Sequence, residues 1–296
     1  MVSYYAPQVV DGHSTPLILM SYENSHLIYY QQRRLLMKLK KIIQVPPKIL
    51  IYSGPGTGKT ALTLTLGSNL QILDLDGGLS TGLYLDDKFK KDRLEVDAIQ
   101  ILEQRPHLQA TVFSRTKSKI IEIANACAKH QYEYEVLALD SITALSNAAL
   151  QSVMASSGDL HGKPQIQHWG LAIDEVKQVM AILASLPIVV VVIGHEQFKT
   201  LGKGTSQEDK IYLGIFGKNL PLQLPGYFDE FWRMRVLAAP GGKFSYKIQT
   251  YATPIAEAKS RSCLPNMTDS SCGMWELLKK IGYEKKGTHN APLRKI

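Results

Sequence analysis

A glycine-rich loop, flanked by an apolar run and a helical pattern, constrains the fold of this chain more than any other feature of the sequence. It reads Ser53-Gly54-Pro55-Gly56-Thr57-Gly58-Lys59-Thr60, and the apolar run 49–52 comes directly before it. Glycines let such a loop fold tightly and turn successive backbone N–H groups toward phosphate oxygens. The dipole of the following helix favours the same negative charge. Strand, loop and helix in this order are the context that a phosphate-binding loop requires.

The residues of the loop have separate expected roles. The Lys59 ammonium would reach the β- and γ-phosphates of ATP, and the Thr60 hydroxyl would hold Mg²⁺. Ser53 stands at the first position of the motif, where the pattern has glycine. The expected ligands are thus ATP and Mg²⁺, and the residues expected to surround the phosphates are Gly54, Pro55, Gly56, Thr57, Gly58, Lys59 and Thr60.

Short apolar runs alternate with helical patterns from residue 48 onward, which is typical of a parallel α/β sheet. Two later segments alternate apolar and polar residues around a turn at Pro240-Gly241-Gly242, which predicts an antiparallel extension. The fold class expected is α/β: a mostly parallel sheet flanked by helices, with an antiparallel C-terminal extension. The expected strands are 49–52, 71–74, 98–102, 135–139, 188–193, 228–238 and 242–250, and the expected helices are 59–70, 116–129, 142–155, 171–186 and 274–281.

The net charge of +8 is concentrated at the two ends of the chain. Residues 1–48 carry six Lys/Arg against two acids, and residues 279–296 carry six against one, so the middle is about neutral. Basic ends on a neutral body favour a polyanionic partner such as nucleic acid, although solvated termini fit the same composition. We expect three parts: a basic helical appendage at 1–46, a domain built around the loop at 47–282, and a basic flexible tail at 283–296.

The sequence also bears on the compartment of the protein. No stretch approaches the roughly 20 apolar residues that span a bilayer, and the first residues lack the basic-then-apolar layout of a secretory signal. The three cysteines, Cys127, Cys263 and Cys272, form an odd and sparse set. These patterns favour a reducing cytoplasm and no membrane partner.

Two apolar strands lead into carboxylates that suit the chemistry of ATP. One ends at Asp140, the layout of a residue that anchors Mg²⁺ beside Thr60. An aspartate that caps the helix from residue 142 is the alternative. The other strand is followed by Asp76, which we expect to orient the attacking water as a general base, with Asp74 in a structural role. An acidic turn without a catalytic role is the alternative there.

The order of these motifs resembles that of RecA-like recombinases. In detail the chain resembles the phage-encoded RecA-like ATPases of recombination and single-strand annealing that are called the Sak-four group. The resemblance covers roughly residues 48–282 and implies a RecA-like P-loop NTPase core. Its signposts besides the loop are Gly77-Gly78-Leu79, Leu139-Asp140-Ser141, Trp169-Gly170, His195-Glu196-Gln197, Phe228-Asp229-Glu230 and Ala258-Lys259-Ser260-Arg261.

The resemblance implies catalytic roles outside the loop. Asp76 stands where RecA proteins place a catalytic glutamate, and His195 stands near the residue that senses the γ-phosphate. A strand-end histidine with local hydrogen bonds is the alternative for His195. Lys259 and Arg261 stand where RecA-like and DnaB-like assemblies place two cations that act on the γ-phosphate of the neighbouring subunit.

The spacing of the two cations fits that role. Alternate residues of a strand share a face, so Lys259 and Arg261 would converge. Arg233 and Arg235 have the same spacing and are rivals for the role, and an ordinary solvated basic strand is the alternative. A pair that acts between subunits implies a ring or filament of identical subunits.

Two loops are candidates for contact with DNA under the same resemblance. The first, 154–165, carries Lys163, and the second, 198–214, carries Phe198, Lys199, Lys203 and Lys210. Lysines on mobile loops suit sequence-independent contact with phosphates, and an aromatic side chain can stack on a base. A flexible surface loop without a ligand is the alternative.

The function expected is that of an ATP-dependent recombinase or annealing protein that binds single-stranded DNA in phage-like recombination or repair. Hydrolysis is expected to be slow and stimulated by DNA. The expected partners are single-stranded DNA, further copies of the chain, and a single-stranded DNA-binding protein whose acidic tail would meet the basic tail 283–296. Three competitors stay open: a hexameric DnaB-like helicase or other nucleic-acid motor, a small-molecule kinase, and a DNA-binding mediator that uses ATP only as a structural ligand.

Overall fold

The computed structural model describes residues 45–84, 96–105, 109–201 and 208–284. The expected appendage 1–46 lies outside the described residues except for its last two positions. The expected tail 283–296 lies outside them except for its first two, and Lys203 also lies outside. These parts of the sequence analysis therefore stay predictions.

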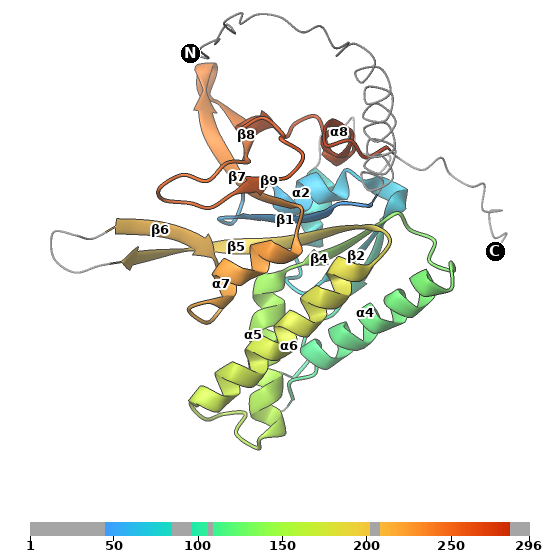
Figure 1. Cartoon of the computed structure of the whole chain (residues 1–296), viewed down its shortest axis with the longest axis vertical. Helices are drawn as coiled ribbons and strands as arrows, with labels where there is room; N and C mark the ends of the chain where they lie inside the picture. Colours follow the sequence, from blue (N-terminus) through green and yellow to red (C-terminus); the bar gives the residue numbers. More distant parts are fainter. Residues whose placement is uncertain (1–44, 85–95, 106–108, 202–207, 285–296) are drawn as a thin grey trace, which may run out of the picture. The chain divides into compact units, whose positions relative to one another are not determined.

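A mostly parallel sheet forms the centre of the described chain (Figure 1). Its strands follow the order β10-β8-β7-β1-β5-β4-β2-β3. The neighbours from β7 to β3 pair in parallel, whereas β8, β9 and β10 pair antiparallel at the C-terminal side. This arrangement confirms the expected fold class. The strands are β1 (Lys48–Ser53), β2 (Leu70–Asp74), β3 (Asp97–Gln100), β4 (Val136–Asp140), β5 (Val189–Leu201), β6 (Glu208–Leu213), β7 (Glu230–Ala239), β8 (Lys243–Gln249), β9 (Lys259–Ser260) and β10 (Thr268–Asp269).

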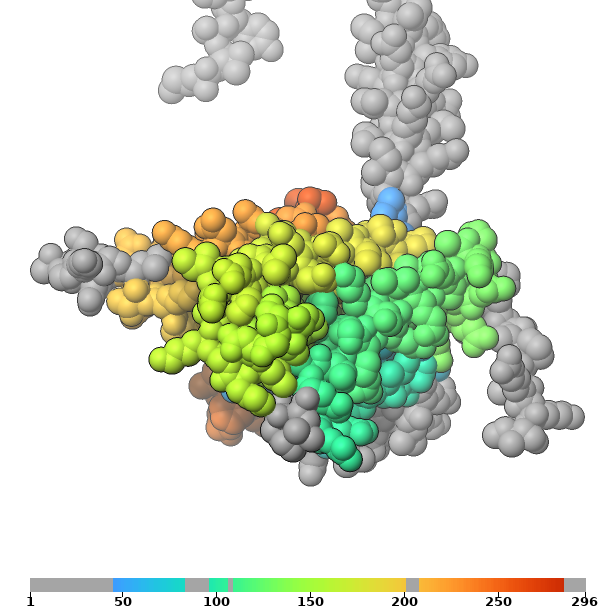
Figure 2. Space-filling view, turned by 90° about the horizontal axis from the view of Figure 1, so that it is seen from below, coloured from blue at the N-terminus to red at the C-terminus, as the bar shows by residue number. Residues whose placement is uncertain are grey.

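Helices cover both faces of the sheet. The helices α4, α5 and α6 form a layer on one face, which Figure 2 shows from below, and α2 and α8 pack on the other. The α-helices are α2 (Lys59–Leu64), α4 (Val112–Ala128), α5 (Ile142–Ser156), α6 (Ile166–Ser185), α7 (Leu220–Gln223) and α8 (Met274–Lys280). The 3-10 helices are η1 (Gly67–Asn69), η2 (Leu79–Tyr84), η5 (Leu224–Tyr227) and η6 (Pro240–Gly242).

The apolar core divides into two clusters because successive side chains of a strand point to opposite faces. Leu50 and Tyr52 of β1 belong to the cluster under α4, α5 and α6. Ile49 and Ile51 belong to the cluster under α2 and α8. The central strands are buried on both faces, which is why they read as continuous apolar runs in the sequence.

One expectation about the chain after residue 193 is wrong. The segment 198–214 is not a loop at its two ends, because β5 continues to Leu201 and pairs antiparallel with β6. A Cβ atom on Gly194 would lie 2.4 Å from Leu213 Cδ1, so a larger residue there would require the Leu213 side chain to move where β6 comes close to β5. The hairpin β5–β6 projects beyond the helical layers (Figure 1). Its polar and glycine-rich composition suggested a loop, because the outer part of the hairpin is held by cross-strand pairing, and only Ile211 and Leu213 of β6 are buried in the core.

The other differences are smaller. The helix after the phosphate loop ends at Leu64, and η1 follows it before β2 begins. Gly67 in η1 has a φ of 63°, a left-handed conformation that ends helices. The helices α4 and α6 begin four and five residues earlier than expected, at Val112 and Ile166. The expected turn at 240–242 is η6, which joins β7 to β8.

Candidate nucleotide-binding site

The phosphate loop lies between the end of β1 and the start of α2 at Lys59. Gly56 and Gly58 have φ values of 72° and 90°, which strongly favour glycine at these positions. Lys59 Nζ donates hydrogen bonds to the carbonyl oxygens of Ser53, at 3.1 Å, and Gly54, at 2.8 Å. Burial lowers the pKa of Lys59, although the carboxylates around it oppose that shift. The ammonium is thus held over the loop, where it can reach a bound phosphate.

Thr60 and Asp140 form the second part of the site. The Thr60 hydroxyl donates to Asp140 Oδ2 at 2.6 Å. Burial raises the pKa of Asp140 to about 6, against the hydrogen bond from Thr60 and with help from the negative charges of Asp76 and Asp74. The helix α5 is capped by Ser141, whose side chain accepts from the Ala144 amide, so the capping role considered for Asp140 is not needed.

These two oxygens fit Mg²⁺. Mg²⁺ is commonly bound by one or two protein oxygens together with substrate phosphates and water. Thr60 and Asp140 would supply the protein share. Within the described residues no group of three or more His, Cys, Asp or Glu side chains could hold a metal ion.

Asp76 follows β2 and His195 lies within β5, the two strands that flank β4, and their side chains meet across the end of β4. The distance from His195 Nε2 to Asp76 Oδ2 is 2.9 Å. Burial raises the pKa of Asp76, but hydrogen bonds from His195 and Ser141 outweigh it, so the net shift is downward. The Asp74 carboxylate accepts from the backbone amides of Asp76 and Gly77 and thereby fixes the turn that carries Asp76. The side chain of His195 is bonded across the site and not locally.

Strand register explains why these groups converge. Asp74 pairs with Asp140 between β2 and β4, and Asp140 pairs with Ile193 between β4 and β5. The three strands therefore end at one edge of the sheet, next to the loop that follows β1. Ligands bind at this edge in open α/β sheets.

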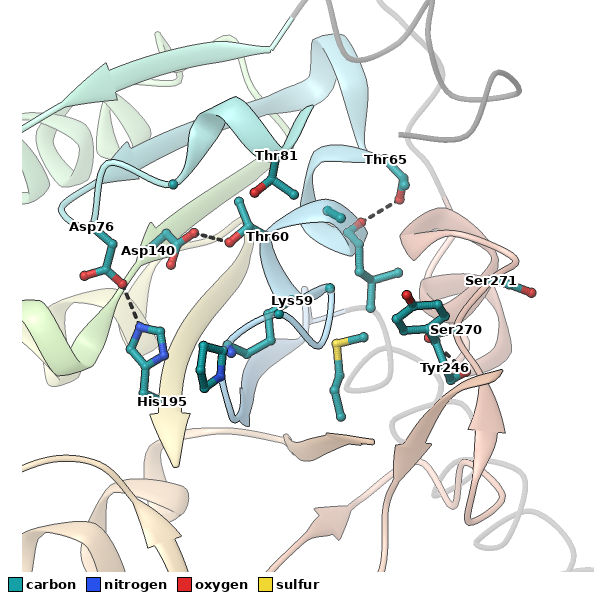
Figure 3. A pocket seen from close by; sticks show the side chains of 17 residues that line it. Lys59, Thr60, Thr65, Asp76, Thr81, Asp140, His195, Tyr246, Ser270 and Ser271 are labelled. Carbon is teal, nitrogen blue, oxygen red and sulfur yellow. Dashed lines mark hydrogen bonds and ion pairs between the residues drawn. The ribbon is translucent and has the colours of Figure 1, made fainter. Parts of the chain in front are cut away.

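A cavity of about 750 Å³ joins these residues. Figure 3 shows Asp76, Asp140 and His195 at one end, with Lys59 between them and Tyr246 at the other end. The far end is built from α2, β7, β8 and the segment after β10, and its residues were not found in the sequence. Its lining residues are Thr65, Met234, Tyr246, Ser270 and Ser271. No motif marks them, because the pairing of distant C-terminal strands brings them to the loop.

A buried ion pair lies beside the phosphate loop. Arg233 Nε and Glu196 Oε2 are 2.9 Å apart, and the two side chains are only 11% and 12% exposed. A Cβ atom on Gly54 would lie 3.3 Å from Glu196 Oε1, which places the carboxylate directly against the loop. Arg233, the rival candidate for a cation that acts between subunits, is thus engaged within its own chain.

Lys259 and Arg261 lie beside the amino end of β7, whereas the phosphate loop lies at the carboxyl end of β1. Lys259 Nζ donates to the carbonyl oxygens of Pro225 and Phe228, at 2.7 and 2.6 Å. Arg261 Nη1 lies 2.8 Å from Asp229 Oδ1, with its side chain 61% exposed. All three partners precede β7, whereas the loop follows the carboxyl end of β1, which runs parallel to β7. The strand β9 ends at Ser260, but the Arg261 amide still donates to the Asp229 carbonyl oxygen at 3.2 Å. Burial and, after it, the positive charge of Arg261 lower the pKa of Lys259, so the two cations do lie near each other.

The residues expected to contact DNA lie in two separate parts of the structure, the hairpin β5–β6 and the connection between α5 and α6. Phe198, 70% exposed, and Lys199 lie on β5, and Lys210 lies on β6 directly opposite Lys199. Lys163 lies in the exposed connection between α5 and α6, which Figure 1 draws apart from the hairpin. The structure thus brings Lys199 and Lys210 together but not Lys163. In the described part of the chain, no helix combines the length and the apolar character that crossing a membrane requires.

Comparisons with known proteins give one family match and two structural similarities. The family described as AAA domain matches residues 45–262. No curated protein matches the sequence. Among solved structures, the chain is similar to a prototypical ATPase from the type III secretion system of pathogenic bacteria, with 15% identity and a TM-score of 0.41. It is also similar to the ATPase EscN, solved with its central stalk EscO from enteropathogenic E. coli, with 14% identity and a TM-score of 0.42.

Both structures are longer than this chain. Each similarity covers 64% of this chain, but only 52% of the first structure and 42% of the second, so the chain spans about half their length. The family match is more extensive, since it includes the phosphate loop, both strand-end aspartates, His195 and the Lys259–Arg261 segment. The chain belongs to this family of AAA domains, and it is a P-loop ATPase built on a mostly parallel sheet between helices.

Proposed function

We propose that this ATPase binds single-stranded DNA as an oligomer and promotes annealing or strand pairing in phage-like recombination or repair, as in the Sak-four group. One observation carries the proposal. The strand β5 contains His195, which is hydrogen-bonded to Asp76 in the nucleotide site, and continues without a break into the hairpin with Phe198 and Lys199. A single rigid strand thus connects the ATP site to a candidate surface for DNA.

The nucleotide site would act through residues with distinct tasks. Lys59 contacts the phosphates, and Thr60 and Asp140 hold Mg²⁺, which neutralises phosphate charge when it is bound. Asp76 orients and deprotonates the attacking water. Its lowered pKa keeps the carboxylate ionised at neutral pH, the state that a base requires. His195 positions Asp76 by donating its Nε2–H to the Asp76 carboxylate.

The hairpin β5–β6 has a face suited to a single strand of DNA. Residues directly opposite in an antiparallel pair share a face, so Lys199 and Lys210 lie on one side together with Tyr212. Lys199 Nζ lies 5.6 Å from the centre of the Tyr212 ring. Cations can contact phosphates while an aromatic ring stacks on a base. Phe198 points to the other face and offers a second stacking surface.

Lys259 and Arg261 would complete the site of a neighbouring subunit in a ring or filament. Their place at the amino ends of β1 and β7 keeps them from the loop of their own chain. The basic appendage 1–46 and the tail 283–296 remain candidates for further contact with DNA or with a single-stranded DNA-binding protein. We further propose a reducing cytoplasm, in which the free cysteines Cys127, Cys263 and Cys272 stay reduced.

The rate of ATP hydrolysis with and without single-stranded DNA tests the proposal. Wild type should be stimulated by DNA, and the double variant Lys199→Ala/Lys210→Ala should lose the stimulation and keep the basal rate. The variant Lys119→Ala/Lys129→Ala removes the same charge from α4 and its end and should behave as wild type. Absence of stimulation in wild type contradicts the proposal. Unwinding of a duplex without annealing would identify a nucleic-acid motor instead.

A further inference from the structure

The cavity at the phosphate loop extends beyond the space that a triphosphate needs. The carboxylates of Asp76 and Asp140 flank one end, and Lys59 and Thr60 lie along the middle (Figure 3). A bound triphosphate places its terminal phosphate next to the groups that hydrolyse it, which are the carboxylates. The ribose and the nucleobase must therefore extend toward the opposite end, where Tyr246 lies.

That opposite end is formed by the antiparallel ribbon β7–β8 and the back of the loop. A Cβ atom on Gly58 would lie 3.8 Å from two carbons of the Tyr246 ring and 3.9 Å from Met234 Cε. The ring and the thioether group therefore stand directly beside the loop. Tyr246 is 39% exposed, and Met234 is buried, so the ring is the accessible part of this apolar wall.

The hydroxyl groups at this end are engaged with the protein. Thr65 Oγ1 donates to the Leu62 carbonyl and accepts from the Met274 amide. Ser270 Oγ donates to the Tyr246 carbonyl oxygen. Ser271 hydrogen-bonds the Asp269 carboxylate through its amide and its side chain. The wall thus offers a ring and a thioether to a base, while its serine and threonine hydroxyls are occupied.

We infer that Tyr246 and Met234 form a nucleobase platform, and that the site recognises a nucleoside triphosphate mainly by its triphosphate and discriminates weakly between bases. The inference rests on the proposed binding of ATP with Mg²⁺ at the loop. Stacking tolerates any base because each base has a π face. An apolar wall discriminates between similar ligands by roughly 100-fold at most, far less than a site that hydrogen-bonds the distinguishing group.

Three substitutions at two positions of β8 test whether the Tyr246 ring itself binds the base. Tyr246→Ala removes the stacking ring, and Tyr246→Phe keeps it. Phe244→Ala is the matched control, because Phe244 lies two residues along β8 on the same face, is 67% exposed, and is not part of the cavity wall. The probes are ATP, GTP and inorganic tripolyphosphate, each with Mg²⁺, and the dissociation constants are measured by titration calorimetry.

Tyr246→Ala should weaken ATP by roughly 5- to 150-fold, the range that stacking on one base contributes. The Tyr246→Ala protein should bind tripolyphosphate as tightly as wild type does, and this result would also show that its phosphate loop is folded. Tyr246→Phe and Phe244→Ala should bind ATP like wild type, and wild type should prefer ATP over GTP by less than about 100-fold.

Three results would overturn the inference. These are a loss of ATP affinity below about fivefold in Tyr246→Ala, an equal loss for tripolyphosphate, or a base preference above about 100-fold. A wild-type chain that binds neither ATP nor tripolyphosphate would overturn the proposed function, and the inference with it.

Discussion

The Nε2 atom of His195 lies 2.9 Å from Oδ2 of Asp76, although 119 positions separate the two residues in the sequence. They meet because β2 and β5 both pair with β4, and the pairing of both strands with β4 ends at Asp140, next to the two side chains. Asp76 stands beside the cavity end where the γ-phosphate would lie, and His195 begins the part of β5 that leads into the hairpin. One hydrogen bond therefore connects the expected base with the expected DNA surface.

The first prediction concerns Asp76. Asp76→Asn should lower kcat by about 10²- to 10⁴-fold, because an amide cannot take a proton from water. The affinity for MgATP should change little. The pKa of Asp76 is shifted downward, so the residue stays ionised from pH 5 to 8. The substitution should therefore lower the whole pH–rate profile in that range without moving its midpoints, which steady-state kinetics can measure.

A second prediction tests the hydrogen bond between His195 and Asp76 from the side of His195. In a double-mutant cycle, His195→Ala and Asp76→Asn should be strongly non-additive in kcat, because each removes the same hydrogen bond. His195→Ala should also reduce the stimulation by single-stranded DNA more than it reduces the basal rate. Additive effects, with DNA stimulation intact, would show that the bond has no part in turnover.

The phosphate loop gives the next prediction. Lys59→Ala should lower ATP hydrolysis by at least about 100-fold, since a cation at the β- and γ-phosphates is lost. Lys119→Ala, on α4 where the lysine pairs with Glu122 outside the cavity, is the control and should hydrolyse ATP like wild type. A Lys59→Ala protein with the wild-type rate would refute the assignment of the ATP site.

The cations at the amino ends of the strands can be tested by mixing subunits. Lys259→Ala/Arg261→Ala should bind ATP and fail to hydrolyse it. Mixed in equal amounts with Lys59→Ala, it should recover about one quarter of the wild-type rate, because one interface in four then combines an intact loop with intact cations. No recovery at any ratio, with mixed oligomers confirmed by mass, would argue against action between subunits.

The buried pair beside the loop predicts a loss of stability. Arg233→Leu should lower the free energy of unfolding by about 3–5 kcal/mol, because it leaves the Glu196 charge buried and unpaired. Glu196→Gln/Arg233→Leu should lose less than Arg233→Leu alone. The control is Lys247→Ala in the exposed pair with Asp269, which should cost less than about 1 kcal/mol. Urea denaturation measures all three, and an Arg233→Leu protein as stable as wild type would contradict the prediction.

The sequence by itself determined the parallel sheet and the central chemistry. A loop of fixed spacing between a strand and a helix places Lys59 and Thr60, and an apolar run ending in Asp140 places the acid beside them. Such features are local, or they follow from the rule that parallel strands end at one edge. Asp76 could be proposed for the same reason, since it comes shortly after a buried strand, whereas the role of His195 was implied by the family resemblance.

Only the tertiary structure decided the contacts that depend on pairing between strands far apart in the sequence. It turned the segment after Phe198 into a hairpin, placed the Arg233 guanidinium on Glu196, and carried Lys259 and Arg261 to the edge away from their own loop. It also built the far wall of the cavity from Tyr246 and Met234. No local pattern marks these contacts, because their register depends on which distant strands become neighbours and on where their buried faces fit.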